Sequence, residues 1–259
     1  MGLADWTIFA TPSMLWVTLV AVGLVGLSKG GLGGAFALMG VPVMSLVMPP
    51  VLAAAVLLPI LLMMDAVSLW IWRHWRDGEV LRTMLPAAVV GIAIGWAAAA
   101  VTSDAVVRLL VGLVALGFAA RWWLARFLGG APRYAPAMGL VWGTIAGFTS
   151  FVAHAGGPLF QIQVLPKRLD PKLYTGTSVL FFAIVNLIKV LPYAMLGMFE
   201  TQVLWSAALM LPLAVISVRI GAAIIRRMRP EVFYPFTYTM VTIVGAKLVW
   251  DGLSVLVRG

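Results

Sequence analysis

Long stretches of apolar residues are the feature that most constrains this chain. Six of them are long enough to cross the hydrocarbon core of a bilayer, which takes about 20 helical residues. They span residues 51–72, 84–101, 105–124, 173–196, 203–225 and 232–256. With 63% hydrophobic and 10% charged residues, the chain lacks the polar side chains that a water-facing surface needs. The sequence therefore predicts an all-α integral membrane protein and excludes a soluble enzyme, a nucleic-acid-binding module and a disordered chain.

Two further apolar segments, residues 13–48 and 136–166, are interrupted by clusters of glycine. The first is split at residues 28–34 and the second at residues 153–158. Glycine lowers helix propensity and proline removes a backbone donor, so each segment is expected to break at its cluster. Non-helical backbone at membrane depth is tolerated only where protein or a water-filled cavity satisfies its amides. The interruptions are therefore expected in the protein interior or beside an aqueous cavity.

The two halves of the chain, residues 1–130 and 131–259, show a weak internal repeat. A shift of 121 residues aligns the residues just before the two interruptions and places Asp65 on Asn186. After a few inserted residues the correspondence continues, with Pro86 on Pro212 and Gly95 on Gly221. Because the interruptions and the mid-helix polar positions coincide together, we interpret the halves as two structural repeats, an organisation common in secondary transporters.

Positive charges decide the expected topology. Twelve of the 18 Lys and Arg residues lie in four loop regions, at residues 73–82, 121–133, 167–172 and 226–229. All twelve share one side, as the positive-inside rule favours, if the second interrupted segment is a re-entrant hairpin. By the repeat, the first interrupted segment is then a hairpin too. Each repeat thus has one hairpin and three transmembrane helices. We therefore expect the two repeats to be inverted relative to each other, with the basic loops in the cytoplasm and both termini in the periplasm. The turns of the two hairpins are expected to converge near the midplane of the membrane. The alternative is eight simple spans.

Ionisable side chains inside apolar segments are candidates for function, because a charge at membrane depth is costly. Lys29 lies in the first glycine cluster, where an ammonium group and backbone amides can bind an anion together. The same cluster supplies Ser28, Gly33 and Gly34 as candidate substrate-binding residues. The alternative is that Lys29 pairs with Asp65 and joins two elements. Asp65 is also a candidate proton carrier.

Asn186 and Lys189 share one helix face because they are three residues apart. We predict substrate contact for both, with hydrogen bonding between helices as the alternative for Asn186. The second glycine cluster offers hydroxyls and amides suited to an oxyanion, and a histidine able to donate a hydrogen bond or carry a proton. Its candidates are Thr149, Ser150, His154, Gly156 and Gly157.

Several other functions are not predicted. With no cysteine and two isolated histidines, the chain has no expected metal site or cofactor. The chain has no sequence motif of a phosphate-binding loop. Ser150 and His154, considered as nucleophile and base of an intramembrane enzyme, have no acidic residue to orient the histidine. No removed signal peptide is expected, because the first residues lack a basic leader. The expected partners are a small anion and the lipid bilayer, but no nucleic acid; small residues could serve either packing within the monomer or the seam of a homodimer. The small residues are Gly91, Gly95, Gly112 and Gly117.

The two glycine-rich motifs resemble those of a known transporter family. Gly26-Leu-Ser-Lys-Gly-Gly-Leu-Gly-Gly34 and Gly147-Phe-Thr-Ser-Phe-Val-Ala-His-Ala-Gly-Gly-Pro158 are similar to motifs of the TauE/SafE family of sulfite-exporter-like permeases. The stretch from Gly176 to Lys189 fits one branch of that family, and the similarity covers nearly the whole chain. The resemblance implies a secondary carrier in the bacterial inner membrane. Its cargo would be sulfite, sulfoacetate or related sulfonates, moved by alternating access. The alternatives are a carboxylate carrier, with or without proton or cation coupling, and a passive anion channel.

Overall fold

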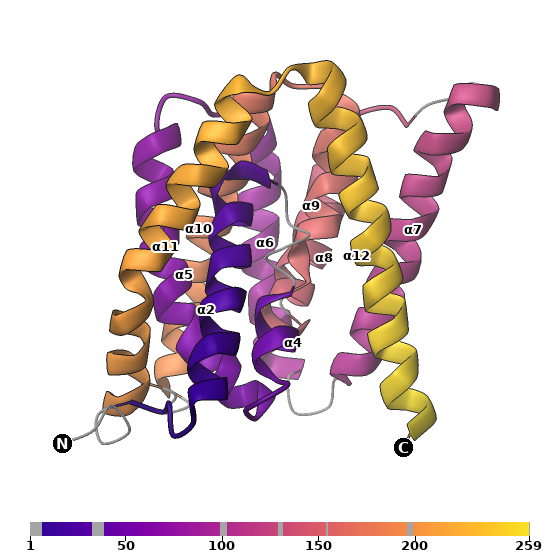
Figure 1. The fold of residues 1–259 in the computed structure, drawn as a ribbon. Coiled ribbons are helices and arrows are strands. Elements are labelled where there is room, and N and C mark those ends of the chain that lie inside the picture. Colours follow the sequence, from indigo (N-terminus) through magenta and orange to yellow (C-terminus); the bar gives the residue numbers. More distant parts are fainter. Residues whose placement is uncertain are drawn as a thin grey trace.

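The computed structural model describes residues 7–32, 39–98, 103–128, 132–153, 155–195 and 199–258, and all regular structure in them is helical (Figure 1). In chain order the helices are α2 (Pro12–Leu27), the π-helical turn η1 (Ser28–Leu32), α4 (Gly40–Met44), α5 (Pro50–Trp72), α6 (Gly78–Ala98), α7 (Asp104–Leu128), α8 (Met138–Ala153), α9 (Gly156–Val164), the 3-10 turn η2 (Leu165–Lys167), α10 (Pro171–Met195), α11 (Thr201–Arg227) and α12 (Pro230–Arg258). Within these residues, seven helices are long and apolar enough to span a membrane.

The six spanning helices predicted from the apolar runs are all present, as α5, α6, α7, α10, α11 and α12. Their outward faces carry exposed apolar side chains, such as Leu187 at 65% and Ile216 at 55%, which suits contact with lipid tails. The seventh candidate span runs from Pro12 to Gly31 and is the first arm of the interrupted segment 13–48. The fold is therefore that of a multi-pass helical membrane protein.

The first interruption falls at η1, as predicted, but lies deeper than predicted. Gly31 has φ of 133°, which a residue with a side chain rarely adopts. A Cβ atom there would lie 2.7 Å from Thr175 Cγ2 and 2.9 Å from Ile225 Cγ1, near the start of α10 and the end of α11. The expectation that the turn lies near the midplane is therefore wrong. The helix from Pro12 to Gly31 has 20 residues and, at 1.5 Å per residue, extends about 30 Å, across nearly the whole bundle.

The second interrupted segment forms a helical hairpin. Helix α8 ends at Ala153 and α9 begins at Gly156. Near the end of α9, the Gln163 side chain donates a hydrogen bond of 3.0 Å to the carbonyl of Ala135, just before α8 begins. The chain thus leaves at the end of the bundle where it entered. The segment is not a single crossing, as the alternative of eight simple spans requires.

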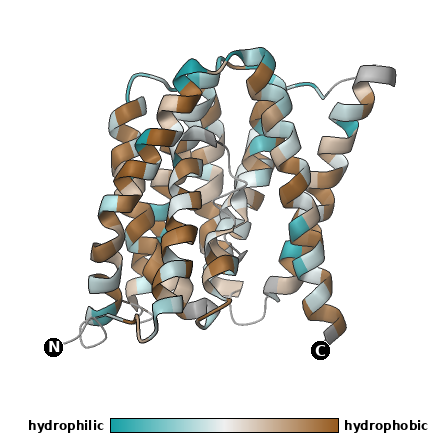
Figure 2. Cartoon of the chain, viewed as in Figure 1, coloured by the Kyte–Doolittle hydropathy of each residue, from teal (hydrophilic) through white to brown (hydrophobic). Residues whose placement is uncertain are grey.

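The four basic loops lie at one end of the bundle, where hydrophilic residues gather (Figure 2). Contacts join segments in or directly beside these loops: Lys167 with Asp77, Tyr134 with Glu79, and Arg226 with the carbonyl of Ile71. Helix α2 begins and α12 ends at the opposite end (Figure 1). The described structure therefore has the single basic end that the charge pattern predicted.

Helix packing places two long helices at the centre of the contacts. Helix α5 packs against both α10 and α11, and α10 also packs against α6. Helix α8 packs along α6, α2 packs along α11, and α7 packs along α12. The α5–α10 contact brings together the polar residues described next.

Candidate functional site

Three polar side chains from η1, α5 and α10 meet in the interior. Lys29 Nζ lies 2.5 Å from Asp65 Oδ1, and Asn186 Nδ2 donates to Asp65 Oδ2 at 2.6 Å. The side chains of Lys29 and Asp65 are 11% and 4% exposed, and Asn186 is buried. Each carboxylate oxygen thus has a donor, as a buried charge requires. The pairing of Lys29 with Asp65 is present, and Asn186 contacts the residue that the internal repeat placed at its own position.

Lys189 is a second cation in the same region, one helical turn after Asn186. It is 2% exposed, and its Nζ donates to the carbonyl of Ser150 at 3.2 Å and to Ser150 Oγ at 3.1 Å. Both acceptors are uncharged, whereas Lys29 has a carboxylate partner. A buried ammonium group held only by neutral acceptors is costly in an apolar interior, which makes Lys189 a candidate for function.

Two side chains of α5 fix the backbone around Lys29. Ser68 Oγ donates to the carbonyl of Lys29 at 3.0 Å, and Trp72 Nε1 donates to the carbonyl of Gly30 at 3.2 Å. These bonds satisfy carbonyl groups left free where the helix breaks at η1. The Lys29 ammonium group also lies 6.0 Å from the centre of the Phe182 ring on α10. The break in the helix is thus attached to both central helices.

The remaining predicted residues are distributed unevenly. Ser28 and Thr149 are buried, but Thr149 Oγ1 donates to the carbonyl of Ile145 in its own helix at 2.8 Å. Gly156 and Gly157 are buried in the first turn of α9. A Cβ atom on Gly156 would lie 2.9 Å from Ser150 Cβ, so this glycine allows the two arms of the hairpin to approach. Gly33, Gly34 and His154 lie outside the described residues.

Sequence reasoning missed Ser68, Trp72 and Phe182. Ser68 lies three residues after Asp65, the spacing that placed Asn186 and Lys189 on one helix face. Ser68 and Asp65 therefore share one face of α5, and that spacing was the signal for Ser68 in the sequence. Trp72 gave no such signal, because a tryptophan at a helix end is commonly an interfacial anchor.

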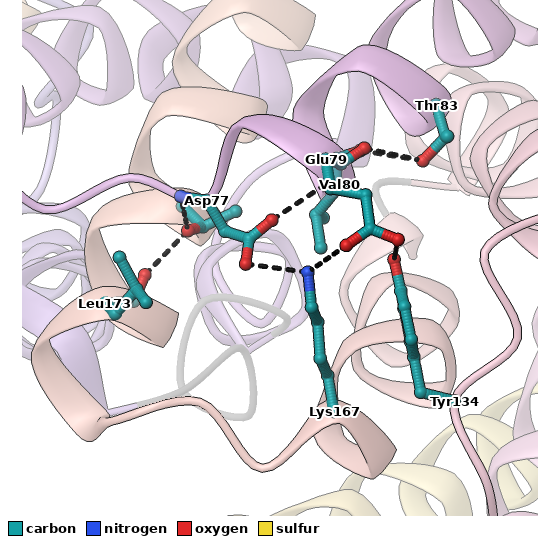
Figure 3. A network of polar contacts seen from close by, with 8 residues as sticks. Asp77, Glu79, Val80, Thr83, Tyr134, Lys167 and Leu173 are labelled. Atoms are coloured by element: carbon teal, nitrogen blue, oxygen red, sulfur yellow. Dashed lines mark hydrogen bonds and ion pairs between the residues drawn. The ribbon is translucent and has the colours of Figure 1, made fainter.

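A second polar network lies at the basic end of the bundle (Figure 3). Lys167 Nζ lies 2.7 Å from both Asp77 Oδ2 and Glu79 Oε2, and the Tyr134 hydroxyl lies 3.4 Å from Glu79 Oε1. Asp77 Oδ1 also accepts from the backbone N–H of Val80 at 3.0 Å, which caps the start of α6. We call Asp77, Glu79, Tyr134 and Lys167 the end network. It joins α6 to the chain that follows the second hairpin.

The charges of the end network stabilise one another. Burial acts to raise the pKa of the Asp77 carboxyl, but the hydrogen bond from Lys167, the backbone hydrogen bonds from Val80 and Glu79, and the positive charge of Lys167 together outweigh burial and bring this pKa below its usual value. Burial acts to lower the pKa of the Lys167 ammonium group, but its bonds to Asp77 and Glu79 outweigh burial and raise it. Both groups are therefore charged at neutral pH.

A multi-pass helical bundle with ionisable residues joined at its centre is the architecture of a membrane transport protein. The chain matches the family model described as "Sulfite exporter TauE/SafE" over residues 18–248. It therefore belongs to the TauE/SafE family and is a membrane transporter, not an enzyme. This confirms the resemblance carried by the two glycine-rich motifs. Comparisons with curated proteins and with solved structures give no match.

Proposed function

We propose that this protein is a secondary carrier of small sulfur-containing oxyanions, such as sulfite and simple sulfonates. The observation that carries the proposal is Lys189, a buried ammonium group whose partners in the described structure are the hydroxyl and carbonyl of Ser150. A tetrahedral oxyanion accepts several hydrogen bonds at once, so it can bind an ammonium group and a hydroxyl together. The family description favours sulfur oxyanions over carboxylates.

Contacts that recur in the two halves support two inverted repeats. Asp65 touches Asn186, which lies 121 residues later. The bond from Ser68 to the Lys29 carbonyl recurs, with the same shift, as the bond from Lys189 to the Ser150 carbonyl.

Packing near the ends of α6 and α11 follows the same pattern. A Cβ atom on Gly95 would meet Phe148 and Phe151, and one on Gly221 would meet Leu27 and Gly30. Leu27 and Gly30 are the residues that the shift assigns to Phe148 and Phe151. Matching contacts at the centre and the periphery are expected if the halves share one fold.

In the proposed mechanism, each hairpin moves with the long helix along which it packs. Helices α6 and α8 form one such pair, α2 and α11 form the other, and α5 and α10 lie between them. Rocking of these pairs about the central helices would open the Lys189 site to one side of the membrane and then to the other, which is alternating access. The basic loops face the cytoplasm of a bacterial cell, and both termini face the periplasm.

Transport into proteoliposomes tests the proposal. We expect the wild-type protein to move sulfite with a rate that saturates with concentration, and Lys189→Met to abolish this transport because the binding charge is lost. The matched control is Lys247→Met, which removes a lysine of α12 that forms an ion pair with Asp251 and whose side chain is 43% exposed. Undiminished transport by Lys189→Met would refute the site, and a rate that never saturates would indicate a channel.

A further inference from the structure

We infer that the central site has one excess positive charge and selects singly charged anions over doubly charged ones. This inference rests on the proposed function and narrows its substrate class. Among the candidate cargoes, monosulfonates have one charge, as does sulfite once it is protonated to hydrogen sulfite, whereas the sulfite dianion has two. Sulfoacetate, with a sulfonate and a carboxylate, has two, as does sulfate.

The charge count comes from three buried side chains. With both lysines protonated, as the binding of an anion favours, Lys29 and Lys189 each contribute one positive charge, and Asp65 contributes one negative charge that pairs with Lys29. Asn186, at the position related to Asp65 by the 121-residue shift, contributes a neutral amide. Lys247 does not add to the cluster, because it pairs with Asp251 on its own helix. The cluster therefore has a net charge of plus one in the described structure.

The net charge determines which anion binds best. A singly charged anion beside Lys189 brings the buried cluster to neutrality. A doubly charged anion of the same shape leaves one negative charge without a partner, and an unpaired charge is strongly unfavourable in a buried site. A difference of this kind corresponds to about 100-fold or more in affinity. The charges of the buried cluster can thus distinguish anions of the same shape that differ in charge.

Methanesulfonate and sulfate form a suitable pair of probes, because both are tetrahedral at sulfur and they differ in charge. We expect the purified wild-type protein at neutral pH to be stabilised thermally by methanesulfonate and to bind sulfate about 100-fold more weakly in calorimetry. Equal affinity for the two anions would overturn the inference. If sulfite and methanesulfonate both fail to bind, the proposed function fails as well, so the two failures are distinguishable.

Two isosteric substitutions change the charge count in opposite directions at touching positions. Asn186→Asp makes the cluster neutral at a pH high enough for both touching carboxylates to be ionised, and should abolish methanesulfonate binding there. Asp65→Asn raises the net charge to plus two and should shift the preference toward sulfate. The double variant with both substitutions restores a net charge of plus one and should recover the wild-type preference for methanesulfonate over sulfate. A purely structural role for Asp65 does not predict this recovery.

Lys247→Met is the control and should bind like the wild type. Retained methanesulfonate binding in Asn186→Asp at a pH where both carboxylates are ionised would overturn the inference. If Asp65→Asn fails to fold, the wild-type protein and Asn186→Asp decide the question.

Discussion

Two glycines of α7 offer a matched test of helix packing in this protein. Gly112 is buried against α12, and a Cβ atom there would lie 2.7 Å from both the carbonyl oxygen of Gly245 and the backbone nitrogen of Val249. Gly117 lies on the same helix, is exposed, and has nothing within 4 Å of its Cβ position. Alanine at the two positions therefore adds the same methyl group to two different environments.

We expect Gly112→Ala to destabilise the protein and Gly117→Ala to leave it unchanged or slightly more stable. Ordinary van der Waals contact begins at 3.4 Å, so α7 and α12 must separate by about 0.7 Å at Gly112, where the neighbours are backbone atoms. Such overpacking typically costs 1–3 kcal/mol, about 1 kcal/mol of which is offset by the higher helix propensity of alanine. At Gly117 only the propensity gain applies. The two variants should thus differ by about 2 kcal/mol in free energy of unfolding.

Thermal unfolding of the purified variants, followed by tryptophan fluorescence, measures this difference. About 2 kcal/mol corresponds to roughly 4–8 °C in Tm for a protein of this size. Methanesulfonate binding should persist in both variants, because the seam between α7 and α12 does not include the central cluster. Equal Tm values would refute the packing argument. A large loss of stability in Gly117→Ala would indicate that α7 packs there against a second copy of the chain.

Two further predictions concern the basic end of the bundle. Lys167→Met removes both ion pairs of the end network and should lower the free energy of unfolding by about 1–2 kcal/mol at pH 7. Lys167→Arg keeps the positive charge and should retain most of the wild-type stability. Asp77 stabilises the folded state fully above its ordinary pKa of 3.8, and this stabilisation is lost as pH falls through the lower pKa of the folded protein. Lys167 stabilises the folded state fully below its ordinary pKa of 10.5, and this stabilisation is lost as pH rises through the raised pKa of the folded protein. Chemical unfolding should therefore show a constant difference in free energy of unfolding between the wild type and Lys167→Met from pH 5 to pH 9. Equal stability of the two proteins at pH 7 would contradict this prediction. Because the chain has no cysteine, single cysteines that replace Arg76 or Glu200 can be labelled selectively in intact cells. A membrane-impermeant maleimide should react with the cysteine at position 200 and not with the one at position 76. The same reactivity at both positions would contradict the cytoplasmic placement of the basic loops.

The helix positions were predictable because lipid imposes one requirement on every span. A run of about 20 apolar residues is needed to cross the hydrocarbon, and the six runs gave six helices. Helix ends were less predictable. Helix α6 begins at Gly78, six residues before the apolar run, because Asp77 caps it and its first turn extends into the polar end network. Hydropathy does not register a polar first turn.

The depth of the first hairpin was not predictable from glycine content. The cluster at residues 28–34 indicated where the helix breaks, and η1 is found there. How far the arm extends before the break depends on its neighbours, and Gly31 reaches Thr175 because α2 and η1 both pack against α11. The repeat aligned Asp65 with Asn186, but it did not predict that the two side chains touch.

The same correspondence explains both the geometry of the central site and its charge. Positions 29 and 150 hold lysine and serine, and positions 68 and 189 hold serine and lysine, so each half contributes one ammonium group from a different element. The hydrogen bond to the hairpin carbonyl is the same in both halves, with a hydroxyl as donor in one and an ammonium group in the other. Asp65 and Asn186 break the symmetry in charge while keeping it in shape. With aspartate at both positions, two carboxylates would balance two ammonium groups, and no positive charge would remain for an anion. Under the proposed function, the preference for an anion therefore depends on the side-chain amide at position 186.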